Sequence, residues 1–238
     1  MEINSNITPS LHPQNITSID GYDDTTAGYV ENAKAALELA YKSLGAVHSA
    51  RTKVNDNSAW SKEKKILELA EFGEKNMDRV LPVFDRTRTN LESGIKSVEQ
   101  AMSESLSKTT PALAQEIRSH IKTLDTTARA ELVQKLFAEK NYDVVTAIID
   151  APAFLSGITT EERENYKRKL HEITNPELVK RVKVMKSALS IIESRGPLVM
   201  IQIEKAIGAN FDLIAKLRNE ESATRRALII KDHEENQA

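Results

Sequence analysis

Residues 176–217, PELVKRVKVMKSALSIIESRGPLVMIQIEKAIGANFDLIAKL, decide the fold expected for this chain of 238 residues. Apolar side chains recur there every three or four positions, at Leu178, Val182, Met185, Leu189, Ile192, Val199, Ile203, Ile207, Phe211, Ile214 and Leu217. The first five follow the spacing of a heptad seam, in which a helix packs lengthwise against other helices. We therefore predict one long helix from Pro176 to about Lys231, with a kink or hinge at Gly196-Pro197.

A helix of that length would extend for about 80 Å and could not bury its apolar stripe alone. Two upstream stretches, 26–54 and 61–106, carry matching stripes and are predicted to pack along it, or along a copy of it in a second chain. Pro82 lies inside the second stretch, so a kink or break is expected near Val80. The seam of the first stretch is half alanine, which lets helices approach closely: Val30, Ala33, Leu37, Ala40, Leu44, Val47 and Val54.

Between the long stretches, residues 108–174 change in character to short elements separated by turn signals. Helices are predicted at 111–123, 126–139, 142–150 and 160–173, with a loop from Ala151 through Gly157. We expect a compact core from their apolar residues: Leu113, Ile117, Ile121, Leu124, Leu132, Leu136, Phe137, Val144, Val145, Ile148, Ile149, Phe154, Leu155 and Ile158.

The sequence thus predicts an all-α protein, an elongated antiparallel helical bundle or coiled-coil rod with a small inserted helical head. The rod comprises residues 26–107 and 175–232, and the head comprises residues 108–174. Residues 1–25 are expected to be a flexible arm, and 233–238 a frayed C-terminus. A rod predicts a hydrodynamic radius well above that of a compact sphere of the same mass. Spaced apolar residues leave open that the arm docks on a neighbour: Ile3, Ile7, Leu11, Ile16 and Ile19.

Composition limits the classes of function. The formal net charge is −2, so no bulk attraction to nucleic acid or membrane is expected. The absence of cysteine excludes disulfides, thiolate catalysis and cysteine-ligated zinc. The N-terminus lacks the pattern of a signal peptide, and no run of apolar residues is long enough to span a bilayer.

Catalytic and cofactor motifs are also missing from the sequence. The histidines stand apart, with no pair at metal-ligand spacing: His12, His48, His120, His171 and His233. Glycine-rich phosphate loops and a nucleophile elbow do not occur. We expect no enzymatic activity, no cofactor and no metal.

Three features are candidates for contacts with partners. Trp60 either closes one end of the bundle or serves as an exposed anchor. The second candidate is the head loop, with Phe154 and Leu155. The third candidate is a basic stretch between residues 163 and 186, where eight basic residues outnumber three acidic ones. This basic collar is either a contact to phosphate or an acidic partner, or a solvated face, which we favour. Its candidate residues are Lys167, Arg168, Lys169, Lys180, Arg181 and Lys183.

The head contains Ala114-Gln115-Glu116-Ile117-Arg118 and, further on, Ala151-Pro152-Ala153-Phe154-Leu155-Ser156-Gly157-Ile158. This combination resembles small helical proteins encoded among bacteriophage and prophage virion genes, over residues 111–173. The resemblance implies a virion or capsid-assembly protein and brings no catalytic residue. In that context Pro152 would end a helix, Phe154 and Leu155 would fill a core, and Gly157 would permit a turn with positive φ.

The expected function is therefore structural: a phage-type virion, scaffold or capsid-assembly protein that spans distance and docks its ends. Its partners would be capsid or other virion proteins and further copies of the chain, in the virion or the host cytoplasm. The alternative is a cytoplasmic helical adaptor that grips one protein partner through the head. A third class, nucleic-acid binding through the basic collar, would show as salt-dependent retention on heparin.

Overall fold

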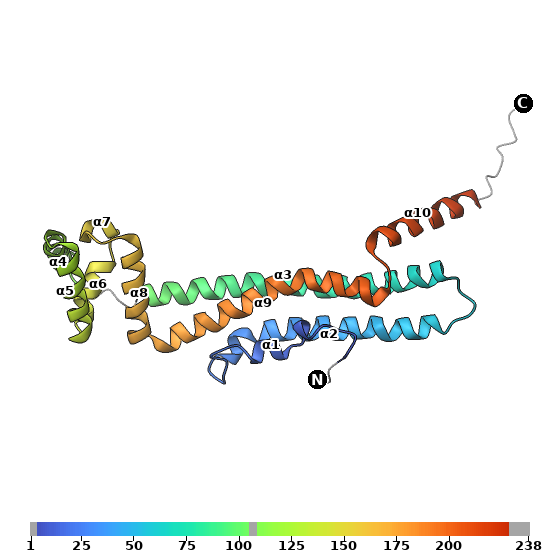
Figure 1. Cartoon of the computed structure of the whole chain (residues 1–238), viewed down its shortest axis with the longest axis horizontal. Helices are drawn as coiled ribbons and strands as arrows, with labels where there is room; N and C mark the ends of the chain where they lie inside the picture. Colours follow the sequence, from blue (N-terminus) through green and yellow to red (C-terminus); the bar gives the residue numbers. More distant parts are fainter. Residues whose placement is uncertain (1–3, 105–108, 229–238) are drawn as a thin grey trace, which may run out of the picture. The chain divides into compact units, whose positions relative to one another are not determined.

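The structure, a computed structural model, describes residues 4–104 and 109–228 (Figure 1). Every regular element within those residues is helical, so the predicted all-α class is confirmed. The chain divides into two compact units, the first formed by Met1–Leu91 and Ser187–Ala238 and the second by Glu92–Lys186. The helices α3 (Lys62–Glu104) and α9 (Pro176–Ile207) each contribute one part to both units.

The first unit is built on α2 (Ala27–Asn55), which buries a seam of alanine, leucine and valine. Six of the seven seam residues predicted there are fully buried, and Val54 alone is partly exposed. Arg51 of α2 donates from Nη1 to the carbonyl of Lys205 in α9, at 2.9 Å. Ile203 and Ile207 of α9 in turn lie against α3 beside Gly73. The second part of α9 therefore contacts both α2 and α3, as the apolar stripes predict.

The expectation of a flexible arm at residues 1–25 is wrong for residues 4–25. A 3₁₀ helix, η1 (Pro9–Leu11), and the short helix α1 (Gln14–Thr17) both pack on α2. Burial of Ile7, Leu11 and Ile16 drives this docking, and the backbone N–H of Asn4 donates to the Tyr41 hydroxyl at 2.6 Å. The open possibility that the arm docks on a neighbouring element is thus the correct one for these residues, while Ile3 lies outside the described residues.

The prediction of one helix from 176 to 231 is wrong at its C-terminal end. α9 ends at Ile207, and α10 (Phe211–Ala227) begins after a turn in which Gly208 has φ 87°. The side chain of Asn210 accepts from the N–H of Leu213 at 2.9 Å and caps α10. By contrast, α9 continues through Pro197, and α3 through Pro82, without interruption. Residues 229–231 and the expected frayed end at 233–238 lie outside the described residues.

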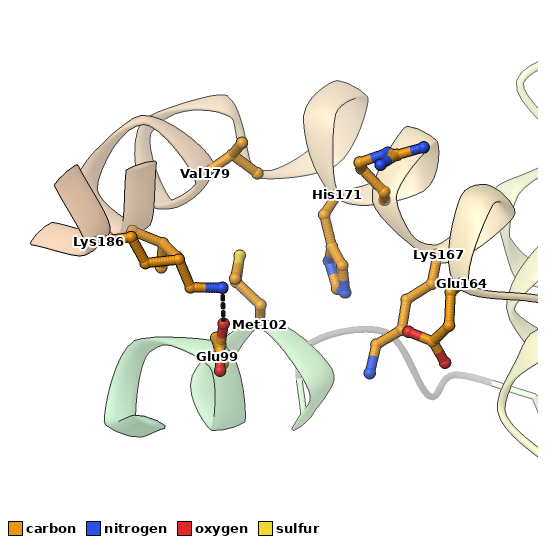
Figure 2. Close-up of a pocket in the computed structure, with 9 residues that line it drawn as sticks. Glu99, Met102, Glu164, Lys167, His171, Val179 and Lys186 are labelled. Carbon is orange, nitrogen blue, oxygen red and sulfur yellow. Dashed lines mark ion pairs between the residues drawn. The ribbon is translucent and has the colours of Figure 1, made fainter. Parts of the chain in front are cut away.

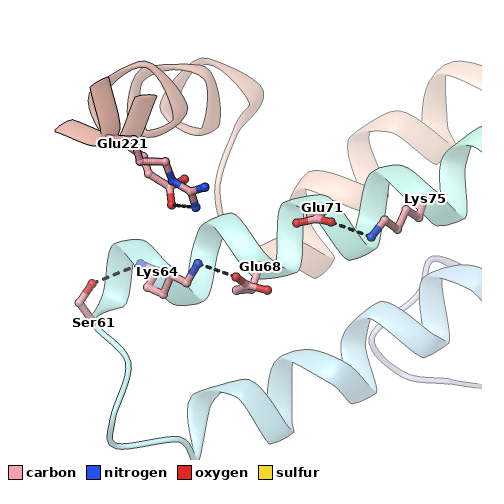
Figure 3. Close-up of polar contacts among 7 residues, drawn as sticks. Ser61, Lys64, Glu68, Glu71, Lys75 and Glu221 are labelled. Atoms are coloured by element: carbon pink, nitrogen blue, oxygen red, sulfur yellow. Dashed lines mark hydrogen bonds and ion pairs between the residues drawn. The ribbon is translucent and has the colours of Figure 1, made fainter. Parts of the chain in front are cut away.

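Charged side chains line the side of α3 that faces α10 (Figure 3). Along α3, Lys64 pairs with Glu68 and Lys75 with Glu71, each at 2.6 Å. Between the helices, Arg218 of α10 forms a bidentate ion pair with Glu74 of α3. Its Nη1 and Nη2 donate to the two carboxylate oxygens at 2.7 and 2.6 Å. Only Ile214 of α10 is buried among the described residues of that helix. The contact between α10 and α3 is therefore largely polar.

The second unit packs four helices around α6 (Tyr142–Ile149). α4 (Pro111–Thr123), α5 (Thr126–Ala138), the four-residue α7 (Ala153–Ser156) and α8 (Thr160–Thr174) all contact α6. The last five residues of α6 are buried, which explains its apolar composition. The core contains these buried residues: Ile121, Val133, Leu136, Phe137, Val145, Ile148, Ile149, Ile158 and Leu170.

Side-chain caps mark the starts of two helices in this unit. Asp125 accepts from the N–H of Ala128 at 2.9 Å and begins α5. Thr159 and Glu162 form a reciprocal capping box at the start of α8. The stretch 151–157, predicted as a loop, instead contains the single turn α7.

Candidate functional site

The most exposed aromatic contact candidate lies on α7. Phe154 is 68% exposed and Leu155 is 41% exposed. The prediction that these two side chains fill the core is wrong, and so is the same prediction for Leu113, which is 50% exposed. Ile158, one turn further on, occupies the core position instead. The segment 151–158, called the α7 tip below, thus directs its aromatic residue to solvent while its end is anchored in the core.

Three side chains hold the backbone around the α7 tip in place, two from neighbouring helices and one from α7 itself. Arg129 of α5 donates to the carbonyls of Gly157, Ile121 and Leu124, the last at 2.7 Å. Arg163 of α8 donates from Nε to the carbonyls of Ile149 and Ala151, at 2.7 and 3.0 Å.

The third anchor is Ser156, whose fully buried hydroxyl donates to the carbonyl of Ile148 at 2.7 Å. Together these bonds satisfy carbonyls in the last turns of α4 and α6 and in the connections that follow them, where an unpaired buried group would destabilise the fold. The α7 tip is therefore a turn whose backbone is held in place by side-chain hydrogen bonds.

Gly157 closes the α7 tip in the left-handed region, with φ 67°. Replacing it with alanine should lower the free energy of unfolding by about 1–2 kcal/mol, because a Cβ is strained there. That Cβ would also lie 3.1 Å from Nη2 of Arg129. Denaturant titration of the purified chain measures the effect. Gly196→Ala is the matched control, since it lies inside α9 with open space around it and should gain stability, by up to about 1 kcal/mol. Equal effects of the two substitutions would contradict the turn geometry.

The residues of the third candidate, the basic collar, differ in their surroundings. Lys169 turns toward α5, where its Nζ lies 4.5 Å from the ring centroid of Phe137 and donates to Gln134 at 3.1 Å. Of the collar residues, Lys167 and Arg168 line a pocket on the second unit. Lys180, Arg181 and Lys183 lie on α9 and do not line it.

This pocket, called the α8 pocket below, has a volume of about 380 Å³ and lies between α3, α8 and α9 (Figure 2). Met102, Val179 and Val182 give it an apolar part. The charged residues around it are Glu99, Glu164, Lys167, Arg168 and Lys186. It also contains His171, which was not among the candidate residues expected from the sequence. The spacing of Glu164, Lys167 and His171 could have indicated it, because residues three and four apart share one face of a helix.

His171 is only 7% exposed, and its ring points into the pocket beside Met102 (Figure 2). Its buried Nδ1 has no hydrogen-bond partner. Burial, and next the positive charge of Lys167, lower the pKa of His171 below its usual value. The imidazole is therefore neutral at pH 7.

Trp60 lies in the turn between α2 and α3 and is 37% exposed. It remains a candidate anchor on the first unit. Among the described residues, no three acidic or histidine side chains cluster in a way that could hold a metal ion. Nor does any described helix combine the length and apolarity needed to cross a membrane.

Comparisons of the chain with protein-family models, with curated proteins and with solved structures each found no match.

Proposed function

We propose that this protein is a non-enzymatic structural protein of the phage virion, scaffold or capsid-assembly type. It acts by docking its helical surfaces on other virion proteins and on further copies of itself, in the virion or the host cytoplasm. The class is supported by the resemblance of residues 111–173 to helical virion proteins. The docking role is supported by one observation above the others: Phe154 is 68% exposed on a turn that three side chains hold in place.

The physical argument concerns the entropy of binding. An exposed aromatic ring offers a large apolar area, and aromatic residues often contribute most of the binding energy at protein interfaces. If the backbone beneath the ring is already fixed, little conformational freedom is lost on association. Leu155, next to it and 41% exposed, enlarges the same apolar surface. The anchors stabilise the fold with or without a binding role, whereas a ring that is 68% exposed in the folded chain is available to contact a partner.

Site-specific photo-cross-linking tests this proposal. A benzophenone amino acid replaces Phe154 in one variant and Ile201, which is 50% exposed on α9, in the control. Both variants are irradiated in cells that naturally carry the gene, and the adducts are identified by mass spectrometry. Adducts at position 154 with particle proteins or with an ordered homo-oligomer, absent from position 201, are the expected result.

Two other outcomes would overturn the proposal. Adducts of position 154 with a single cellular protein in a defined hetero-complex would identify a cytoplasmic helical adaptor instead. Identical adducts from positions 154 and 201 would show that the α7 tip has no particular role in docking.

A further inference from the structure

The α8 pocket carries more positive than negative charge once its internal ion pairs are taken into account. Glu99 pairs with Lys186 at 2.7 Å, drawn as a dashed line in Figure 2. Glu164 pairs with Nη1 of Arg163 at 2.9 Å. Both acidic residues of the pocket are thus already neutralised by basic residues of this chain.

Two cations remain. Nη2 of Arg168 donates to the neutral side chain of Asn165 at 2.7 Å, and Arg168 forms no ion pair within the described residues. Lys167 likewise has no ion-pair partner in the part of the chain that the structure describes. Two cations in the lining of one pocket, neither of them in an ion pair, attract an anion that enters it. The charge of this pocket therefore favours a negatively charged occupant.

His171 adds an independent reason. A polar side chain that is more than nine-tenths buried ordinarily has a hydrogen-bond partner, and leaving one without a partner is unfavourable. His171 is 7% exposed, points into the pocket, and has an unpartnered ring nitrogen. Its neighbours in the pocket are Met102 on α3 and Lys167 one helical turn earlier on α8. A ligand that supplies hydrogen-bonding oxygen atoms fits this arrangement.

The remaining wall of the pocket is apolar. Met102 and Val182 are nearly buried, and Val179 is partly exposed. A volume of about 380 Å³ lies in the range of small-ligand sites. We propose that the α8 pocket binds a small organic anion, an oxyanion carried on a short apolar chain, with Lys167 and Arg168 facing the oxyanion and Met102, Val179 and Val182 facing the chain.

Protonation of His171 should strengthen this binding. The charged groups around the imidazole are Glu99 of α3, Lys186 of α9, and Glu164, Lys167 and Arg168 of α8. Burial and Lys167 lower its pKa in the free protein, and a bound anion opposes the effect of Lys167. The affinity for the anion should therefore rise as the pH falls through the titration range of this histidine.

The test uses hexanoate, butyl phosphate and hexanol as probes, added to the full chain in a buffer free of phosphate. The readout is the NMR signal of the His171 ring, assigned by its loss in His171→Gln. Hexanoate, whose carboxyl pKa is about 4 to 5, stays ionised from pH 6 to 8 and serves for the pH series. We expect both anions to shift the His171 signal, hexanol to leave it unchanged, and hexanoate to bind more tightly at pH 6 than at pH 8.

Matched variants locate the site. Lys167→Gln and Arg168→Gln should each weaken hexanoate binding about fivefold, the effect of losing one partly exposed charge interaction. Lys169→Gln removes the same charge from the same helix, but its Nζ lies over Phe137, so binding should not change. Unfolding curves confirm that each variant is folded.

The two anions also distinguish the source of the oxyanion. Tighter binding of hexanoate would point to a carboxylate ligand, and tighter binding of butyl phosphate to a phosphate ester, and either result supports the site. No shift with either anion, an equal shift with hexanol, or equal weakening by Lys169→Gln would each overturn it.

Discussion

Replacing Ile148 with alanine should lower the free energy of unfolding of the second unit by about 2–5 kcal/mol. Ile148 is fully buried on α6, the helix that contacts α4, α5, α7 and α8. Alanine would remove apolar contacts with several helices at once and leave a cavity that tight packing prevents from closing. Amide hydrogen exchange along α6 measures the change within this unit, and denaturant titration measures it for the whole chain.

Leu113→Ala is the control for that prediction. The sequence places Leu113 and Ile148 in the same core, but the structure leaves Leu113 50% exposed on α4. The loss at Leu113 should therefore stay below about 1 kcal/mol, since half of its surface is in water even in the folded chain. A larger loss at Leu113 than at Ile148 would contradict the packing of α4 on α6.

Gly208→Ala should destabilise the first unit by about 2–3 kcal/mol. One part of this loss is the strain of a side chain at φ 87°. The other is displacement of the Arg51 guanidinium, because the new Cβ would lie 2.5 Å from its Nη2. Arg51 could then no longer donate to the carbonyl of Lys205, a bond worth about 1 kcal/mol. Denaturant titration again provides the measurement.

A double-mutant cycle with Arg51→Ala separates the two causes. In the Arg51→Ala background the contact is already gone, so Gly208→Ala should cost only the backbone strain, about 1–2 kcal/mol. If Gly208→Ala is as harmless as Gly196→Ala in either background, the turn between α9 and α10 is not as described.

Helix boundaries were predictable where a residue of specific chemistry marks them. Pro111 begins α4, Asp125 caps α5, and Thr159 with Glu162 begins α8, and each was visible in the sequence. The break at Gly208 was missed because the apolar stripe continues at helical spacing from Ile207 to Phe211. A glycine in the left-handed region and an asparagine cap outweigh that periodicity. The stripe reports which face is buried and does not establish that the helix is continuous.

The N-terminal arm was mispredicted for a related reason. Its apolar residues stand singly among polar ones, and its composition is that of a tail. Ile7, Leu11 and Ile16 become buried because this segment packs on α2. That contact forms by tertiary folding, so a local pattern in the arm cannot reveal it.

The candidate site was predictable in part. Phe154 and Leu155 were proposed as contact residues of the head loop, but the core role also assigned to them was wrong. The anchors Arg129 and Arg163 come from other elements, so no spacing within the α7 tip indicates them. In the basic collar, the sequence could not show that Lys169 turns toward Phe137 while Lys167 lines the α8 pocket.

The proposed docking of the chain on its partners depends most on Phe154. The direct measurement is competitive incorporation: wild type and a variant are co-expressed in cells that carry the gene, and their ratio in isolated particles or homo-oligomers is compared with the ratio in the lysate. Phe154→Ser should be depleted about tenfold or more, the effect expected for a central aromatic anchor, while Ile201→Ser keeps the input ratio. Incorporation of Phe154→Ser at the input ratio would contradict the docking role of the α7 tip.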